Sequence, residues 1–246
     1  MNVPIFFAAG RGQLELVYIW SQATPEAKVI IFFLIIFSVM AWFVMISKYL
    51  QMKQAKRLNQ FFTTEFRSQK TVLDMFDRKI QAEGCPLFMV YQAGSIELDA
   101  RLRNTDSTRK RLISIKGIEH VKRNMENAVA QESLKLESGL ILLAIAVSGA
   151  PFLGLLGTVW GVMDAFTGVA EAGSPNLVAM APGVSGALIT TVTALCVAIP
   201  AMFGYNFLVT SIRGIIVEMD NYAAELASEF EHKYVDHGSR ESAFRR

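Results

Sequence analysis

Three long stretches without a charged side chain constrain this 246-residue chain more than any other feature. No Asp, Glu, Lys, Arg or His occurs in residues 29–47, 138–163 or 172–212, which are runs of 19, 26 and 41 positions. A helix that crosses a membrane needs about 20 apolar residues, and all its backbone polar groups must pair within it. We therefore expect three membrane-spanning helices, with a short loop and one long helix in the third run.

The expected order of segments follows from these runs and from the residues that break helices. Gly173, Ser174 and Pro175 predict a loop before the third span. The loosely amphipathic sequence QLELVYIW at 13–20 is typical of a helix at the membrane surface. We expect this amphipathic helix within residues 1–27, spans at 28–47, 138–164 and 177–210, a polar helical region at 48–137, an outer loop at 165–176 and a C-terminal helix and tail at 211–246.

The distribution of basic residues predicts the orientation of the spans. Residues 48–135 contain 17 Lys and Arg against 10 Asp and Glu, and four of the basic residues follow the first span directly. Short loops rich in Lys and Arg remain on the cytoplasmic side. We therefore place 48–137 and the C-terminus in the cytoplasm, and the N-terminus and the 165–176 loop on the other side. A basic patch in contact with anionic lipid is an alternative to a plainly solvated charged face.

The remaining patterns are helical. Residues 49–80 and 108–136 have long, mixed-charge side chains, separated by a break at Gly84–Pro86 and a turn near Asp106 or Ser107. The second of these helices is expected to run into the second span without a strong break. No strand pattern of useful length occurs. The fold class is therefore all-α: an integral membrane protein with three transmembrane helices extended into a cytoplasmic helical bundle. A soluble protein with buried helices is disfavoured by the uncharged runs.

Enzyme and metal motifs are absent from the sequence. It has no G-x-x-x-x-G-K-[ST], no C-x-x-C and no H-E-x-x-H, and its net charge of +2 is too balanced for a nucleic-acid binder. The two cysteines, Cys85 and Cys196, lie in different segments and are expected to stay reduced. We therefore expect no enzymatic activity, no cofactor, no metal site and no nucleic-acid partner.

Small residues recur at helical spacing in the last two spans. Gly154, Gly157 and Gly161 share one helix face, and a second stripe begins at Gly183 and Ala187. Small residues let helix backbones approach closely in a membrane. Hydroxyl groups accompany both stripes and can line a wet cavity, although tight packing alone also explains them. The hydroxyl residues are Thr158, Ser185, Thr190, Thr191 and Thr193.

One absence is informative about a proton path. Asp164 closes the second span, and no other carboxylate lies inside either of the last two apolar runs. A proton path normally requires a titratable group within the membrane. If this chain moves protons, a partner is therefore expected to supply the acid.

Two blocks of these spans resemble a known family. The sequences APFLGLLGTVWGVMDAF (150–166) and MAPGVSGALITT (180–191), followed by AIPAMFGYN (198–206), are similar to the TolQ/ExbB/MotA proton-channel family, and most closely to TolQ and ExbB. The resemblance implies a homopentamer in the bacterial inner membrane, with its N-terminus in the periplasm. The pentamer would surround two copies of a TolR- or ExbD-like protein, each with one span that carries an Asp. Proton motive force would then drive mechanical work on the cell envelope.

The resemblance also implies roles for individual residues. Thr158 of GTVWG and Thr191 of ALITT correspond to threonines near the partner's Asp. We assign the predicted ion pathway to Thr158, Ser185, Gly186, Thr190 and Thr191. We assign the predicted helix packing to Pro151, Gly154, Gly157, Gly161, Pro182, Gly183, Ala187 and Pro200.

The sequence departs from the family at one place. Many TolQ and ExbB proteins carry an Ala-Glu pair where this chain has Ser185 and Gly186, so a glutamate is missing. Water held by Ser185 and Thr190 is one way to fill that gap. A pentameric scaffold that conducts no protons is an alternative function, and a transporter permease is a third. The N-terminal segment and the tail favour a Tol–Pal role over ExbB-like energising of TonB, and Na⁺ remains an alternative to H⁺.

Overall fold

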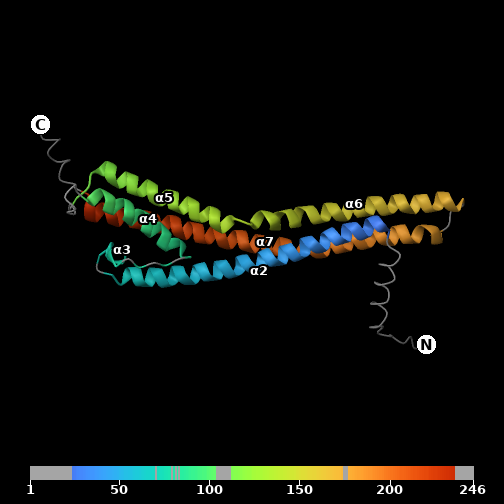
Figure 1. Cartoon of the computed structure of the whole chain (residues 1–246), viewed down its shortest axis with the longest axis horizontal. Coiled ribbons are helices and arrows are strands. Elements are labelled where there is room, and N and C mark those ends of the chain that lie inside the picture. Colours follow the sequence, from blue (N-terminus) through green and yellow to red (C-terminus); the bar gives the residue numbers. More distant parts are fainter. Residues whose placement is uncertain are drawn as a thin grey trace, which may run out of the picture. The chain divides into compact units, whose positions relative to one another are not determined.

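The computed structural model describes residues 24–69, 71–78, 80, 82, 84–103, 112–173 and 177–235. These residues form six helices, shown in Figure 1, and no strand within the described ranges. The helices are α2 (Pro25–Arg67), α3 (Asp74–Asp77), α4 (Pro86–Leu102), α5 (Ile115–Glu137), α6 (Leu140–Ala172) and α7 (Leu177–Tyr234). The all-α fold class is confirmed. α2, α6 and the part of α7 from Met180 onward are each long and apolar enough to cross a membrane.

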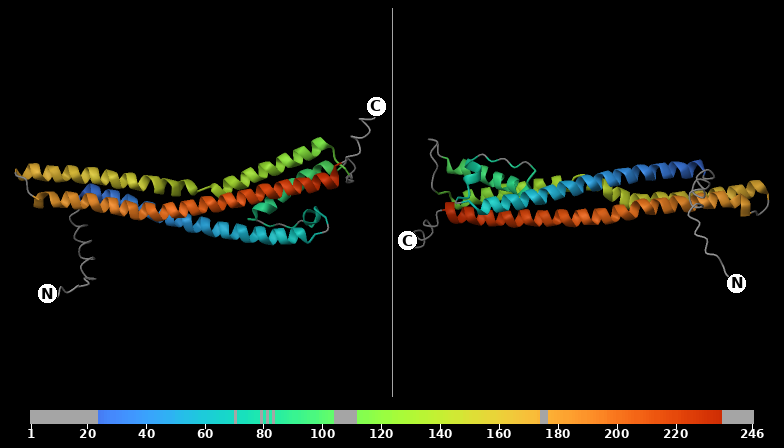
Figure 2. Two further views of the ribbon diagram at one scale, coloured as in Figure 1. Left: turned by 180° about the vertical axis from the view of Figure 1, so that it is seen from behind. Right: turned by 90° about the horizontal axis from the view of Figure 1, so that it is seen from below.

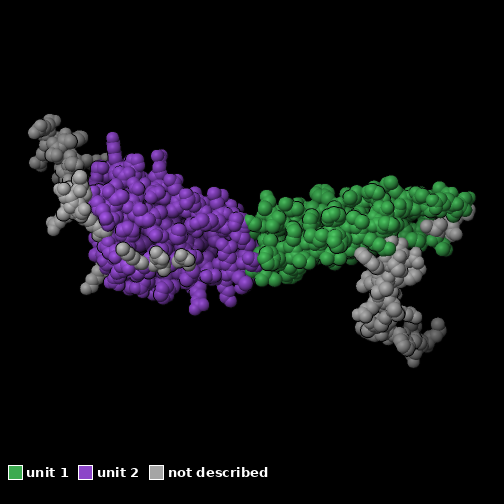
Figure 3. Space-filling view, in the orientation of Figure 1, with its two compact units in different colours: residues 1–46, 139–206 green, residues 47–138, 207–246 purple. Residues whose placement is uncertain are grey.

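The chain divides into two compact units (Figure 3). The first, which we call the membrane unit, comprises the described parts of residues 1–46 and 139–206. The second, which we call the polar unit, comprises the described parts of residues 47–138 and 207–246. α2 and α7 each contribute residues to both units. The helix of the first uncharged run, 29–47, therefore continues into the polar unit, as expected for transmembrane helices that extend into a helical bundle.

The membrane unit is a bundle of three helices. The first half of α2 lies beside α6 and α7 in each view of Figures 1 and 2. A core of small and branched side chains joins them, with Phe37 and Leu153 packed against it. Its buried members are Ile30, Leu34, Ala150, Ala194, Val197 and Ala198. Most large side chains of this unit point outward instead, as expected for a surface in contact with lipid or with other spans.

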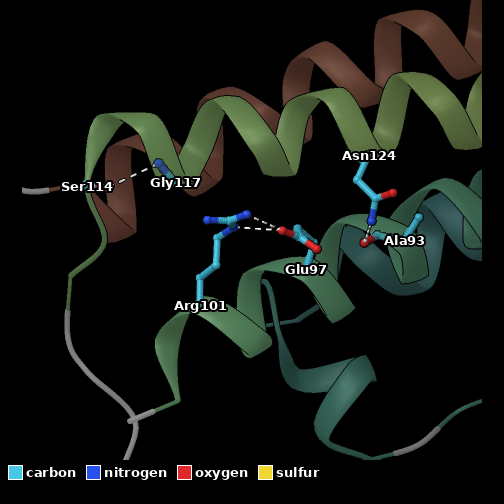
Figure 4. A network of polar contacts seen from close by, with 6 residues as sticks. All are labelled: Ala93, Glu97, Arg101, Ser114, Gly117 and Asn124. Atoms are coloured by element: carbon cyan, nitrogen blue, oxygen red, sulfur yellow. Dashed lines mark hydrogen bonds and ion pairs between the residues drawn. The ribbon is translucent and has the colours of Figure 1, made fainter.

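The polar unit packs α4 and α5 against the second half of α7 and the end of α2. Figure 4 shows its polar contacts: Arg101 pairs with Glu97 at 2.7 Å, and the Asn124 amide donates to the Ala93 carbonyl at 3.2 Å. α4 begins at Pro86, where a proline suits the first turn. Ser114 caps α5, and its hydroxyl accepts a hydrogen bond from the Gly117 amide at 3.2 Å.

The structure corrects two expectations about helix boundaries. Residues 49–80 are not one helix, because α2 ends at Arg67 and the short helix α3 follows after a turn. The run from α5 into the second span is not continuous either. Ser138 and Gly139 interrupt it, and Gly139 has a φ of +81°, a conformation that favours glycine. Asp106 and Ser107, the predicted caps, lie outside the described residues.

The ends of the apolar helices differ slightly from expectation. α6 continues to Ala172, past the predicted start of the outer loop at 165, and Gly173 ends it with a φ of +65°. Ser174 and Pro175 lie outside the described residues, as does the amphipathic sequence at 13–20, whereas residues 25–27 of the predicted N-terminal segment already belong to α2. Pro151, Pro182 and Pro200 all lie inside helices, which neighbouring helices make tolerable in a membrane.

Candidate functional site

Two glycines, Gly161 and Gly183, bring the backbones of α6 and α7 close together. A Cβ atom added to Gly161 would stand 2.6 Å from the Gly183 carbonyl oxygen and 2.8 Å from the Cβ of Ala187. A Cβ on Gly183 would stand 2.6 Å from the Gly161 carbonyl oxygen and 2.7 Å from the Ala165 nitrogen. Because these neighbours are mostly backbone atoms, a larger residue at either position must push the helices apart. We call this line of contacts between α6 and α7 the glycine seam.

The seam continues toward the middle of both helices. Thr190 is fully buried, and a Cβ on Gly157 would stand 2.7 Å from the Cβ of Thr190. A Cβ on Gly154 would stand 2.6 Å from the Cβ of Ala194 and 3.2 Å from the Cα of Thr191. The structure thus brings together most of the residues that the sequence assigned to helix packing.

Thr191 joins the two helices by a hydrogen bond. Its hydroxyl donates to the Gly154 carbonyl of α6 at 3.2 Å and lies 3.5 Å from the Ala187 carbonyl of its own helix. Neither pattern nor composition pointed to this contact between helices. One sequence feature could have predicted it: a threonine beside the small-residue stripe of one helix and a glycine in the stripe of the other. A glycine has no side chain to cover the backbone, so a hydroxyl of the neighbouring helix can reach its carbonyl.

Thr158 and Thr190 bond within their own helices. The Thr158 hydroxyl donates to the Leu155 carbonyl at 2.7 Å, and the Thr190 hydroxyl donates to the Ala187 carbonyl at 2.7 Å. A hydroxyl oxygen that donates one bond can still accept others. Thr158 is half-buried and follows Gly157, while Thr191 is half-buried and follows Thr190. The two threonines therefore flank one contact, the one between Gly157 and Thr190.

The other predicted site residues are placed as follows. Ser185 is half-buried and Gly186 is buried, both on the first turns of α7 after Pro182. Pro151 is exposed on α6, outside the seam, while Pro182 and Pro200 are half-buried. The structure therefore brings Thr158, Thr190 and Thr191 to one level of the seam and leaves Pro151 apart from it.

Asp164 is the carboxylate nearest to this seam. It lies on α6 next to Ala165, and its Oδ2 atom is buried without a hydrogen-bond partner in the described part of the chain. No group of three or more His, Cys, Asp or Glu that could hold a metal ion occurs among the described residues. With only hydroxyls and carbonyls at its centre, the seam can accept and pass hydrogen bonds, and the described side chains there supply no acid or base.

Comparison with known proteins assigns the chain to a family. The model of the MotA/TolQ/ExbB proton channel family matches residues 97–221, which are just over half of the chain. The Tol-Pal system protein TolQ of Pseudomonas aeruginosa is 32% identical over 191 residues, covering 76% of this chain and 79% of that protein. The chain belongs to the MotA/TolQ/ExbB family. The match spans all of α5 and α6 and the glycine seam.

Relatives named ExbB match the chain as well. The biopolymer transport protein ExbB of Xanthomonas campestris pv. campestris is 42% identical over 127 residues, which cover 52% of this chain and 48% of that protein. The ExbB of Pseudomonas putida is 28% identical over 208 residues, covering 84% of this chain and 60% of that protein. The chain thus spans about half the length of the Xanthomonas relative. Both ExbB and TolQ names occur among its relatives, so the resemblance found in the sequence is confirmed at the level of the family.

Proposed function

We propose that this protein is the channel-forming subunit of a proton-driven machine in the bacterial inner membrane. Five copies would surround two copies of a TolR- or ExbD-like protein, and the N-terminus of each copy would lie in the periplasm. Proton flow would be converted into mechanical work on the cell envelope. A role in the Tol–Pal system is favoured, since TolQ of Pseudomonas aeruginosa matches over most of its own length. ExbB-like energising of TonB-dependent uptake is the alternative.

One observation carries the proposal. Thr158 and Thr191 flank the same close contact of the glycine seam, and the described apolar parts of both helices hold no acid or base deep in the membrane unit. A proton needs a titratable group within the membrane. The partner's membrane Asp would supply that group, and the two threonines would hydrogen-bond with it or with the water around it.

Within this proposal the four hydroxyls of the pathway differ in their roles. Thr190 is fully enclosed between α6 and α7, which suits packing of the seam. Ser185 is half-buried and lies next to Gly186, the position at which the resemblance to TolQ and ExbB implies a glutamate. Ser185 is therefore the hydroxyl best able to hold water in the space that the missing side chain leaves. Ser185→Ala would reduce proton flow if this water is part of the path.

The test removes each hydroxyl without changing much volume. Thr158→Val and Thr191→Val, co-produced with the single-span partner, should keep assembly intact and lower proton flux about tenfold, which equals about 1.4 kcal/mol on the barrier to proton transfer. Thr167→Val is the matched control, because its hydroxyl also donates to a carbonyl of α6, that of Met163 at 3.1 Å, at an exposed position. Unchanged flux in both seam variants would contradict the assignment.

The absence of the third-span glutamate supports a second candidate, a pentameric scaffold that conducts no protons. Gly186 is buried and offers no side chain that could replace the carboxylate. The same assay separates the two functions. A channel subunit shows flux that disappears when the partner's membrane Asp is neutralised, whereas a scaffold assembles with the partner and shows no flux with either form.

A further inference from the structure

A cavity of about 320 Å³ lies in the polar unit, outside the residues that the family model matches. Its walls come from the end of α2, the segment that leads to α3, and α7 between residues 222 and 229. This volume is at the lower end of the range for small-molecule sites, about 300–1,000 Å³. None of the roles proposed above for the glycine seam uses it.

Two polar side chains of the cavity wall lack a partner. Tyr222 is only 7% exposed, and its hydroxyl oxygen is buried without a hydrogen bond in the described structure. Both amide atoms of Gln69 are buried and unpaired in the same way. By contrast, the hydroxyls of Thr63 and Thr71, which also line the cavity, bond to Asn59 and Asp74. Buried polar groups are nearly always paired, so three unpaired atoms at one cavity indicate a ligand atom or water between them.

Two carboxylates give the cavity its charge. Glu225 and Glu229 follow Tyr222 by three and seven residues, which places all three on one face of α7. Arg67 contributes one positive charge to the wall, and Lys233 lies one turn beyond Glu229. None of the ion pairs found among the described residues involves either carboxylate. The wall therefore carries one more negative charge than positive, and it offers more hydrogen-bond acceptors than one arginine can satisfy.

Aromatic rings complete the wall. The rings of Phe66 and Tyr222 line the cavity and meet edge to face, with their centroids 5.6 Å apart. Aromatic faces attract cations, and a planar guanidinium stacks on them more readily than a compact ammonium does. Burial raises the pKa of Glu229, the neighbouring Glu225 carboxylate adds to this effect, and Lys233 offsets only part of it. Both causes indicate a pair of acids that a bound cation would relieve.

We propose that this cavity binds a guanidinium group, with the Glu225 and Glu229 carboxylates, the Gln69 carbonyl oxygen and the Tyr222 hydroxyl oxygen accepting its N–H bonds. A guanidinium presents five donors in one plane, which suits several convergent acceptors better than a single ammonium point charge. The group comes either from a free small molecule or from an arginine side chain of a protein segment. The inference does not depend on proton conduction.

The test measures binding to the full chain in detergent by isothermal titration calorimetry. The probes are arginine methyl ester, citrulline methyl ester, whose side chain is an uncharged urea in place of the guanidinium, and a five-residue peptide with a central arginine between alanines. We expect saturable binding of at least one guanidinium probe and none of citrulline methyl ester. Binding of the ester indicates a free small molecule as the ligand, whereas binding of the peptide alone indicates a protein segment. If neither binds, or if citrulline methyl ester binds as well, the proposal is wrong and the cavity holds only water.

Variants assign the binding to this cavity. Glu225→Gln with Glu229→Gln should weaken it about tenfold, because each carboxylate would make a charge-assisted hydrogen bond. Tyr222→Phe removes only the hydroxyl, keeps the ring packing and should weaken binding less. Glu231→Gln is the matched control, since this exposed glutamate of α7 is not part of the wall. Equal weakening by Glu231→Gln would overturn the assignment. The assay uses neither partner nor proton gradient, so its failure is distinct from a failure of the proposed channel function.

Discussion

The membrane unit and the polar unit are built by opposite rules of packing. Among the described residues, the largest fully buried side chains lie mostly in the polar unit, and of these only Leu34 and Leu143 belong to the membrane unit. Between α6 and α7 of this unit, glycines face backbone atoms and a threonine. The polar unit instead buries Tyr91, Phe230 and other large side chains. The difference has a physical cause, because lipid is as apolar as leucine and gives no hydrophobic drive between helices, whereas water does.

The contrast is sharpest where one helix follows both rules. α7 presents Gly183, Ala187 and Thr190 to α6 in its first half, and buries Met219, Tyr222 and Phe230 in its second half. Small residues give van der Waals contact between backbones, while large residues remove apolar area from water. Changes of residue size should therefore act in opposite directions in the two halves.

The largest expected effect is the loss of a ring from the polar unit. Phe62 is 2% exposed, and its ring lies within 6 Å of those of Phe66, Phe88, Tyr91 and Tyr222, measured between centroids. Phe62→Ala should lower the free energy of unfolding of this unit by about 3–5 kcal/mol. Hydrogen exchange should then show lost protection in α4 and retained protection in α6.

Its neighbour in the sequence is a matched control. Phe61 is 70% exposed, so Phe61→Ala removes the same ring from the surface of α2. It should leave exchange in α4 unchanged. If both variants destabilise α4 equally, the ring cluster around Phe62 is not the core of the polar unit.

The second largest effect is expected from the opposite kind of substitution, a larger side chain in the membrane unit. Gly161→Val places a branched side chain where a single Cβ already stands 2.6 Å from the Gly183 carbonyl oxygen. Overpacking of this kind costs about 1–3 kcal/mol. We expect faster exchange or proteolysis in α6, lower yield of the assembled complex, and unchanged protection in α4 and α5.

Gly214 supplies the control for that substitution. It lies on α7, the helix that Gly161 of α6 faces, and a Cβ added there meets no atom within 4 Å. Gly214→Val should therefore change neither assembly nor exchange in α6. Normal assembly of the Gly161→Val variant would show that α6 and α7 are not held together by backbone contact.

The two units also differ in how far their sequence predicts them. The apolar helices and the small-residue stripes could be predicted, because an absence of charge over 19 or more positions and a spacing of three and four are local patterns. The interruption at Gly139 could not, since one glycine in an apolar run is equally compatible with a continuous helix. Its φ of +81° appears only in the structure.

In the polar unit, the contacts that the sequence did not predict join residues far apart in the chain. Phe62 and Tyr222 belong to segments with no shared pattern, and their rings meet with centroids 5.7 Å apart. Lys48 is another case, because the sequence used it only to orient the first span. The structure buries it, and its ammonium donates to the Leu136 carbonyl at 3.1 Å and the Ser138 hydroxyl at 3.3 Å. Lys48 thus pairs with the last carbonyl groups of α5. The sequence does not reveal this contact, because Lys48 and Leu136 are 88 positions apart.

The smallest expected effect concerns charged side chains. The polar unit contains some that are half-buried, whereas the described apolar runs of the membrane unit contain none. Burial, with the nearby Glu225 carboxylate, raises the pKa of Glu229 above its ordinary value. A carboxyl whose pKa is higher in the folded than in the unfolded chain favours folding while it is protonated. This contribution is present below the unfolded pKa and is lost as the pH rises through the folded one. The thermal stability of the polar unit should therefore decline slightly as the pH rises from about 4.5 toward neutrality.

Glu229→Gln isolates this contribution, because it removes the ionisation and keeps the shape of the side chain. The variant should melt slightly higher than the parent at neutral pH and equally at acidic pH, with Glu231→Gln showing no such difference. The two melting curves are to be compared without added cations, since a guanidinium bound to Glu225 and Glu229 would lower the pKa of both and reverse the trend. If the parent instead loses more stability than Glu229→Gln as the pH falls, the Glu229 carboxylate is paired in the folded state, and the cavity already holds its cation.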